Sequence, residues 1–260
     1  MFRRLPPFGG DQRAVAEIVN NIMDGKTNNT GSVTLATGNA TTTTITDARI
    51  GIDSVILLAP NSAAAFADTA PYGAFQDSTD QSAASTTVAY PMTFNTTDFS
   101  NGVYLSNSSR LNVRNAGIYN LQFSVQLENT DNVQHDVDIW FRKNGTNITA
   151  SNSKFTVPAR KSAGVYGHVI GAINYFIELA ANDYVEIVWR TENTSVTLEQ
   201  TPAESSPTRP ATPSVIATMQ YVAPNAMDNV YISSQTNGSA VITHFANSTA
   251  SKTYKYVIVG

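Results

Sequence analysis

Apolar and polar residues alternate strictly along residues 117–127, which predicts a β-strand with one buried face and one solvated face. The apolar positions are Tyr119, Leu121, Phe123, Val125 and Leu127. The same period-2 pattern returns in two later runs, Val137, Ile139 and Phe141, then Val185, Ile187 and Trp189. Asn144-Gly145 follows the first of these runs and is a strong hairpin-turn signal. We therefore predict a two-sheet β-sandwich.

Short strands are also predicted at both ends of the chain, over residues 32–35, 41–46 and 54–58 and over residues 230–233, 239–245 and 253–259. The C-terminal piece is too short to hold a core of its own. We expect the two ends to pair into one split β base module, residues 30–69 plus 223–260, with a sandwich domain of residues 70–222 inserted between them. Insertion at an exposed loop with nearby ends is physically undemanding.

Residues 1–29 are predicted to form an anchoring arm and one short helix. Val15, Ile18, Val19 and Ile22 recur at helical spacing behind Asp11, a residue suited to cap a helix. A helix this short needs a surface to pack on. That surface is either the chain's own sheet or two further copies of the helix around a symmetry axis.

The arm ahead of the helix holds apolar and basic residues around Pro6-Pro7, which force an extended path. Little neighbouring chain is present for it to fold against. It is either disordered or an anchor that docks on a partner, and we favour the anchor. Its anchoring residues would be Phe2, Arg3, Arg4, Leu5 and Phe8.

Composition narrows the functional classes. Charged residues are only 14% of the chain and the net charge is −4, so there is no basic footprint for nucleic acid. The absence of cysteine excludes disulfides and thiolate metal sites. We find neither a signal peptide nor an apolar stretch of membrane-spanning length, and expect a product made in the cytoplasm without membrane insertion.

No catalytic or cofactor motif is recognisable, so we predict no enzyme activity, no cofactor and no metal site. The three histidines, His135, His168 and His244, lie far apart in the sequence. His135 stands near Asp131, Asp136 and Asp138, which suggests either a cation site or, as we favour, a solvated polar cluster. Paired acids for glycoside hydrolysis remain an alternative, because spacing in sequence does not report spacing in space.

Two exposed features are candidate contact surfaces. Trp140 alternates with Ile139 and Phe141 and should point to the outer face of its sheet, as a subunit contact, which we favour, or as a ligand platform. Residues 202–213 are rich in proline and serine and predict an exposed loop without regular structure.

The two ends of the chain resemble a small β-module of tailed-bacteriophage structural proteins. The carrying residues are Arg13-Ala14-Val15-Ala16-Glu17-Ile18-Val19-Asn20, Gly25-Lys26-Thr27-Asn28, Ser32-Val33-Thr34-Leu35, Asp47-Ala48-Arg49, Gly51-Ile52-Asp53-Ser54-Val55-Ile56-Leu57-Leu58, Tyr231-Ile232-Ser233-Ser234, Val241-Ile242-Thr243-His244 and Tyr254-Lys255-Tyr256-Val257-Ile258-Val259-Gly260. Members of that family often run directly from an alanine-rich turn into the Tyr-Ile-Ser strand. The long interposed stretch here supports an insertion.

The inserted stretch resembles the C1q/tumour-necrosis-factor jelly roll. The residues on which this resemblance rests are Asn115-Ala116-Gly117-Ile118-Tyr119, Phe141-Arg142-Lys143-Asn144-Gly145 and Ala181-Asn182-Asp183-Tyr184-Val185-Glu186-Ile187, with residues 214–222 as the closing strand. This resemblance implies a sandwich that assembles as a homotrimer, for which Val15, Ile18, Val19, Ile22 and Trp140 are the expected contacts.

The two resemblances together imply a non-enzymatic bacteriophage virion protein on the particle surface. It would be a trimeric head fibre, a capsid decoration protein or a short tail fibre, held to another virion protein through the N-terminal arm. A host surface glycan or receptor is a further expected partner. A secreted carbohydrate-binding module and a glycan depolymerase are the alternatives.

Overall fold

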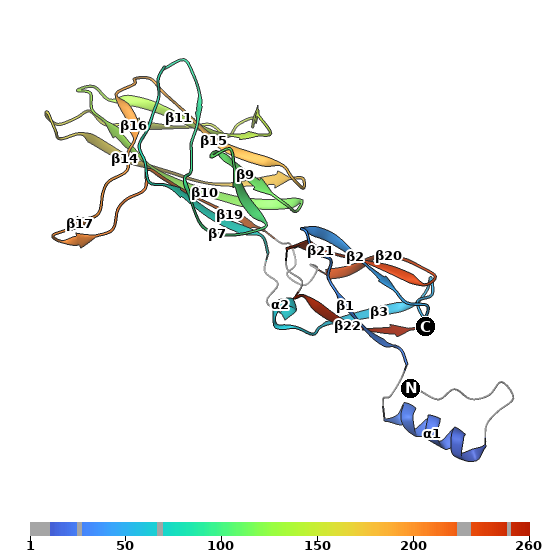
Figure 1. The fold of residues 1–260 in the computed structure, drawn as a ribbon. Helices are drawn as coiled ribbons and strands as arrows, with labels where there is room; N and C mark the ends of the chain where they lie inside the picture. Colours follow the sequence, from blue (N-terminus) through green and yellow to red (C-terminus); the bar gives the residue numbers. More distant parts are fainter. Residues whose placement is uncertain (1–10, 25–27, 67–69, 223–229, 249–250) are drawn as a thin grey trace. The chain divides into compact units, whose positions relative to one another are not determined.

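The computed structural model describes residues 11–24, 28–66, 70–222, 230–248 and 251–260. The predicted all-β class with one short N-terminal helix is confirmed. The chain divides into two compact units, one made of Met1–Asp68 with Met227–Gly260 and the other of Thr69–Ala226. Each unit is described by itself below (Figure 1).

The first unit contains two three-stranded sheets, and each sheet combines strands from both ends of the chain. One has the order β1 (Thr30–Thr34), β22 (Thr253–Val259), β3 (Val55–Pro60), and the other has β2 (Ala40–Thr46), β21 (Ser239–Asn247), β20 (Val230–Thr236). All neighbours are antiparallel. The expected pairing between the two ends is therefore present, and it closes the unit around a core that includes Ile45, Ile242 and Ile258.

A polar network holds the end of β2 to β22. Tyr256 donates its hydroxyl hydrogen to Oδ2 of Asp47 at 2.8 Å, and Nε of Arg49 donates to Oδ1 of Asp47 at 2.8 Å. Arg49 also donates to the carbonyl oxygen of Thr30 at 3.2 Å. The hydrogen bonds from Arg49 hold the pKa of the Asp47 carboxyl well below its usual range. Gly31 completes the arrangement, because a Cβ at this position would lie 2.1 Å from Cζ of Tyr256.

We expect Asp47→Asn to destabilise the first unit by about 1–2 kcal/mol at pH 7, because it removes charge-assisted hydrogen bonds. A lowered carboxyl pKa stabilises the folded state above the unfolded-state pKa, and this contribution is lost as pH falls toward the folded-state value. The difference between variant and wild type should therefore shrink in acid. Amide hydrogen exchange of β22 at pH 7 and near pH 2 measures this change, because the contribution is lost only below the unfolded-state pKa of the carboxyl.

Asp53→Asn is the matched control, because Asp53 is an exposed aspartate of the same unit. Its exchange should follow the wild type at both pH values. A pH-independent difference between Asp47→Asn and wild type would contradict the electrostatic explanation.

The second unit is a sandwich of two seven-stranded antiparallel sheets. The first sheet follows the order β5 (Gln81–Ser82), β16 (Val196–Leu198), β10 (Gly117–Asn129), β19 (Val215–Tyr221), β4 (Tyr72–Asp77), β7 (Thr96–Asn101), and β14 (Gly167–Leu179) pairs with β10. The second follows β12 (Thr146–Asn147), β11 (His135–Lys143), β15 (Tyr184–Thr191), β9 (Arg110–Val113), β8 (Val103–Ser106), with β13 (Ser153–Val157) on β11 and β6 (Tyr90–Pro91) on β15.

The core of this unit lies between the two sheets. The five alternating apolar residues of β10 are buried, as are Ile139 and Phe141 of β11 and Ile187 and Trp189 of β15. Phe141 contacts Phe123 across the sheets with ring centroids 5.9 Å apart. The period-2 prediction of the buried faces is confirmed.

The two turn predictions have different outcomes. Asn144 and Gly145 have φ values of 47° and 82°, as the predicted hairpin turn between β11 and β12 requires. The expectation of an irregular loop at 202–213 is wrong in part, because β17 (Glu204–Ser205) pairs with β18 (Thr208–Arg209). This small hairpin extends from the sandwich (Figure 1), and an ion pair between Arg209 and Glu204 spans it at 2.7 Å.

The predicted helix is α1 (Gln12–Met23), and a second, one-turn helix, α2 (Ala63–Phe66), follows β3. Asp11 caps α1 by accepting a hydrogen bond from the backbone N–H of Ala14 at 2.7 Å. Val15, Val19 and Ile22 are exposed along it. In the parts of the chain that the structure describes, no helix has the length and apolarity to cross a membrane.

Candidate functional site

The outward face of the sheet formed by β14, β10, β19, β4 and β7, here called the neutral face, exposes large apolar side chains. Phe99, Ile170 and Phe176 are 58–62% exposed, and Ile118 and Ile216 are also exposed. The outward positions between them are filled by amides, hydroxyls and alanine. Along the middle of β10, β14 and β19 these are Asn120, Gln122, Ser124, Gln126, Ala172, Asn174, Thr218 and Gln220.

A groove of about 370 Å³ crosses the neutral face. Tyr72 and Phe99 line it with rings 5.8 Å apart, and side chains of β10 and β19 also line it. Oδ1 of Asn120, one of the lining residues, is buried and has no hydrogen-bond partner among the residues that the structure describes. A buried carbonyl oxygen without a donor is costly, so a donor group brought to this groove would be bound favourably.

The outward face of the second sheet has a different chemistry, because it carries paired charges. Asp138 accepts a hydrogen bond from Arg190 at 2.7 Å across β11 and β15, and Lys154 lies 3.2 Å from Asp136 across β13 and β11. The hydrogen bonds from Thr156 and Lys154 lower the pKa of Asp136. We call this surface the charged face.

Trp140 lies on the charged face, partly exposed, as its alternation with Ile139 predicted. Its indole N–H donates to Oδ1 of Asn147 at 2.9 Å, so the ring is held in place. A groove of about 310 Å³ runs beside it, lined also by Asp138, Ile148 and Asn152. An aromatic ring flanked by amides and a carboxylate can stack on an apolar surface and hydrogen-bond to hydroxyl groups.

The predicted polar cluster around His135 is present but dispersed. Nε2 of His135 lies 2.8 Å from Oδ2 of Asp131, and this contact lowers the pKa of Asp131. Asp136 and Asp138 are instead paired with Lys154 and Arg190. The four side chains therefore do not meet at one point, and the preference for a solvated polar cluster over a cation site stays a prediction.

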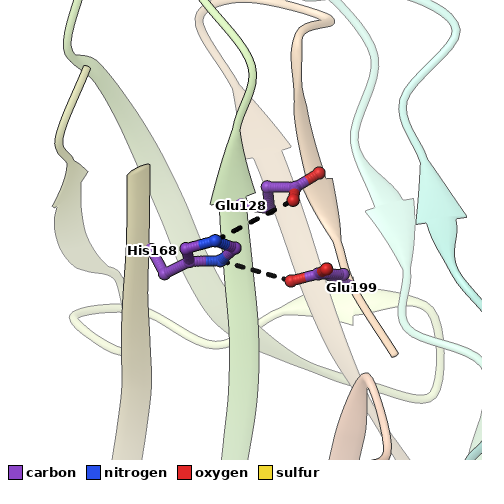
Figure 2. Close-up of side chains that lie close together, drawn as sticks. All are labelled: Glu128, His168 and Glu199. Atoms are coloured by element: carbon purple, nitrogen blue, oxygen red, sulfur yellow. Dashed lines mark ion pairs between the residues drawn. The ribbon is translucent and has the colours of Figure 1, made fainter. Parts of the chain in front are cut away.

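His168, in contrast, meets two carboxylates from distant parts of the chain. Glu128 and Glu199 flank its ring (Figure 2), and nitrogen and carboxylate oxygen atoms of the three residues lie within 4.8 Å of one another. Sequence reasoning passed over this group, because its members are separated by dozens of residues and only strand pairing brings them together.

The residues expected to act in assembly do not share one place. Phe2, Arg3, Arg4, Leu5 and Phe8 lie outside the described residues. Val15, Ile18, Val19 and Ile22 lie on α1 in the first unit, whereas Trp140 lies in the second. The neutral face was missed, although the alternation in β10 already assigned its amides to an outward surface.

The chain was compared with known proteins. It matches no family model, and no curated protein matches its sequence. The resemblances to a phage β-module and to the C1q-like jelly roll stay predictions.

Proposed function

We propose that this chain is a non-enzymatic structural protein of a bacteriophage virion that assembles as a homotrimer through the neutral face. The observation that supports it most is the exposure of Phe99, Ile170 and Phe176 on a surface where the middle stretches of the central strands carry amides, hydroxyls and alanine instead of charged side chains. Interface centres are enriched in aromatic residues and depleted of charge. Large exposed apolar patches on soluble domains commonly mark contact sites.

A second copy of the chain is the occupant that fits this surface. The uncharged middle of the neutral face can meet its own copies without like-charge repulsion, and amides can donate and accept at once, so they can pair with the same amides of a neighbour. Such a neighbour would also supply the donor that Oδ1 of Asn120 lacks. The charged face, which holds Trp140, offers no comparable apolar area, so we place the trimer contact on the neutral face rather than at Trp140.

Phe176→Asp should convert the trimer to a monomer, because it places a charge within the proposed apolar contact. Multi-angle light scattering of the full chain at micromolar concentration should give a molar mass of three chains, each of 27.9 kDa, for the wild type and of one chain for the variant. Trp140→Ala is the matched control and should remain trimeric.

Circular dichroism should give the same spectrum for both variants and the wild type, which shows that Phe176→Asp still folds. A monomeric wild type would contradict the assembly proposal. If Trp140→Ala dissociates and Phe176→Asp does not, the contact lies on the charged face instead.

The virion assignment rests on the resemblance of the two chain ends to the phage module. The N-terminal arm would attach the trimer to a capsid or tail protein, as head fibre, decoration protein or short tail fibre. Deletion of residues 1–10 should then abolish incorporation into particles and leave the light-scattering mass trimeric. Immunoblots of purified particles measure incorporation, and normal incorporation of the truncated protein would make the anchor assignment wrong.

A second candidate function, recognition of a host surface glycan, is favoured by the groove beside Trp140. Its indole ring is fixed by Asn147, and Asn152, which donates a hydrogen bond to Asp138 at 3.2 Å, adds with it polar atoms to the groove that can also bind hydroxyl groups. Trp140→Ala should reduce binding to a responding glycan on an array at least tenfold, as loss of an aromatic platform would do. Equal binding by Trp140→Ala and wild type would exclude this groove as the glycan site.

A further inference from the structure

Glu128, His168 and Glu199 are brought together by backbone pairing rather than by flexible loops. Glu128 of β10 stands directly opposite His168 of β14 in the antiparallel register. Glu199 follows β16, which pairs with the same end of β10, and its backbone N–H donates to the carbonyl oxygen of Gln126 at 3.0 Å. Three adjacent chain segments thus fix the three residues at one edge of the neutral face.

The three side chains face one another, and Figure 2 shows one ring nitrogen of His168 directed to each of the two carboxylates. Nδ1 of His168 lies 3.2 Å from Oε2 of Glu199, and Nε2 lies 4.0 Å from Oε2 of Glu128. Ligands that share one metal ion at about 2.0–2.2 Å lie roughly 3–3.5 Å apart. His168 is about half exposed, so small rotations of its ring and of the carboxylates can reach that geometry.

The carboxylates have too little positive charge around them. Within the described residues, His168 is the only partner with which Glu128 and Glu199 form an ion pair. A cation at this position would relieve the repulsion between the two carboxylates.

We propose that Glu128, His168 and Glu199 form a binding site for one divalent transition-metal ion, with Zn²⁺ as the ion that fits best. One imidazole nitrogen and two carboxylates are ligands that Zn²⁺ accepts, and three protein ligands leave a fourth position open to water. Ca²⁺ and Mg²⁺ prefer oxygen ligands in larger number. The bound ion would link β14, β10 and the segment after β16.

The competing possibility is a metal-free ion pair in which a protonated imidazole bridges both carboxylates. It explains the contacts but needs no metal affinity. Isothermal titration calorimetry of the chelator-treated full chain with ZnCl₂ and, separately, MgCl₂ at neutral pH distinguishes the metal site from the ion pair. We expect one Zn²⁺ per chain and no measurable binding of Mg²⁺.

Glu128→Gln, Glu199→Gln and His168→Ala should each weaken Zn²⁺ binding at least tenfold, and Zn²⁺ should raise the melting temperature of the wild type but not of these three variants. His135→Ala is the matched control, because this histidine also faces a carboxylate but lies outside the cluster; it should bind Zn²⁺ as the wild type does. Phe176→Asp should retain the affinity, since all three ligands come from one chain.

Undetectable Zn²⁺ binding by the wild type would overturn the proposal in favour of the bridged ion pair. So would equal affinity in the wild type, Glu199→Gln and His168→Ala, because the ion would then bind elsewhere. Either result leaves the assembly proposal standing, since the trimer is measured without metal.

Discussion

The antiparallel pairing of β10 is the constraint on which the second unit depends. This strand pairs over its full length with β14 on one side, and with β19 and β16 on the other. Its apolar residues lie in the core and its polar residues face outward, so one strand fixes both the interior and the neutral face. A shift of one residue in its register would exchange the two faces. The groove and the His168 cluster would be lost together.

The first unit depends on pairing of another kind, between strands that lie at opposite ends of the sequence. β22 lies between β1 and β3, and β21 lies between β2 and β20. Because the C-terminal strands occupy the centres of both sheets, the first unit is complete only when the end of the chain is in place. The network of Asp47, Arg49 and Tyr256 then secures the connection with side chains from both ends of the chain.

The two outward faces of the sandwich suit different contacts. On the charged face, most carboxylates already have a cationic partner, such as Arg190 for Asp138, and a single fixed tryptophan offers a small apolar platform. On the neutral face the exposed apolar side chains are more numerous and more widely spread, and Oδ1 of Asn120 is buried without a donor among the described residues. The proposed glycan contact and the proposed subunit contact would therefore lie on different faces of one domain.

The sequence by itself determined the all-β class, the buried faces of β10, β11 and β15, the capped helix and the turn at Asn144, because each follows from local periodicity or backbone preference. It also indicated that the strands at the two ends pair with each other, since neither end can hold a core alone. Only the tertiary structure decided which outward face is apolar, because Ile118, Ile170 and Phe176 are scattered among polar residues and become neighbours through strand register. The same holds for the cluster around His168. Its partners Glu128 and Glu199 come from β10 and from the segment after β16, and no local pattern in the sequence indicates that these segments are close.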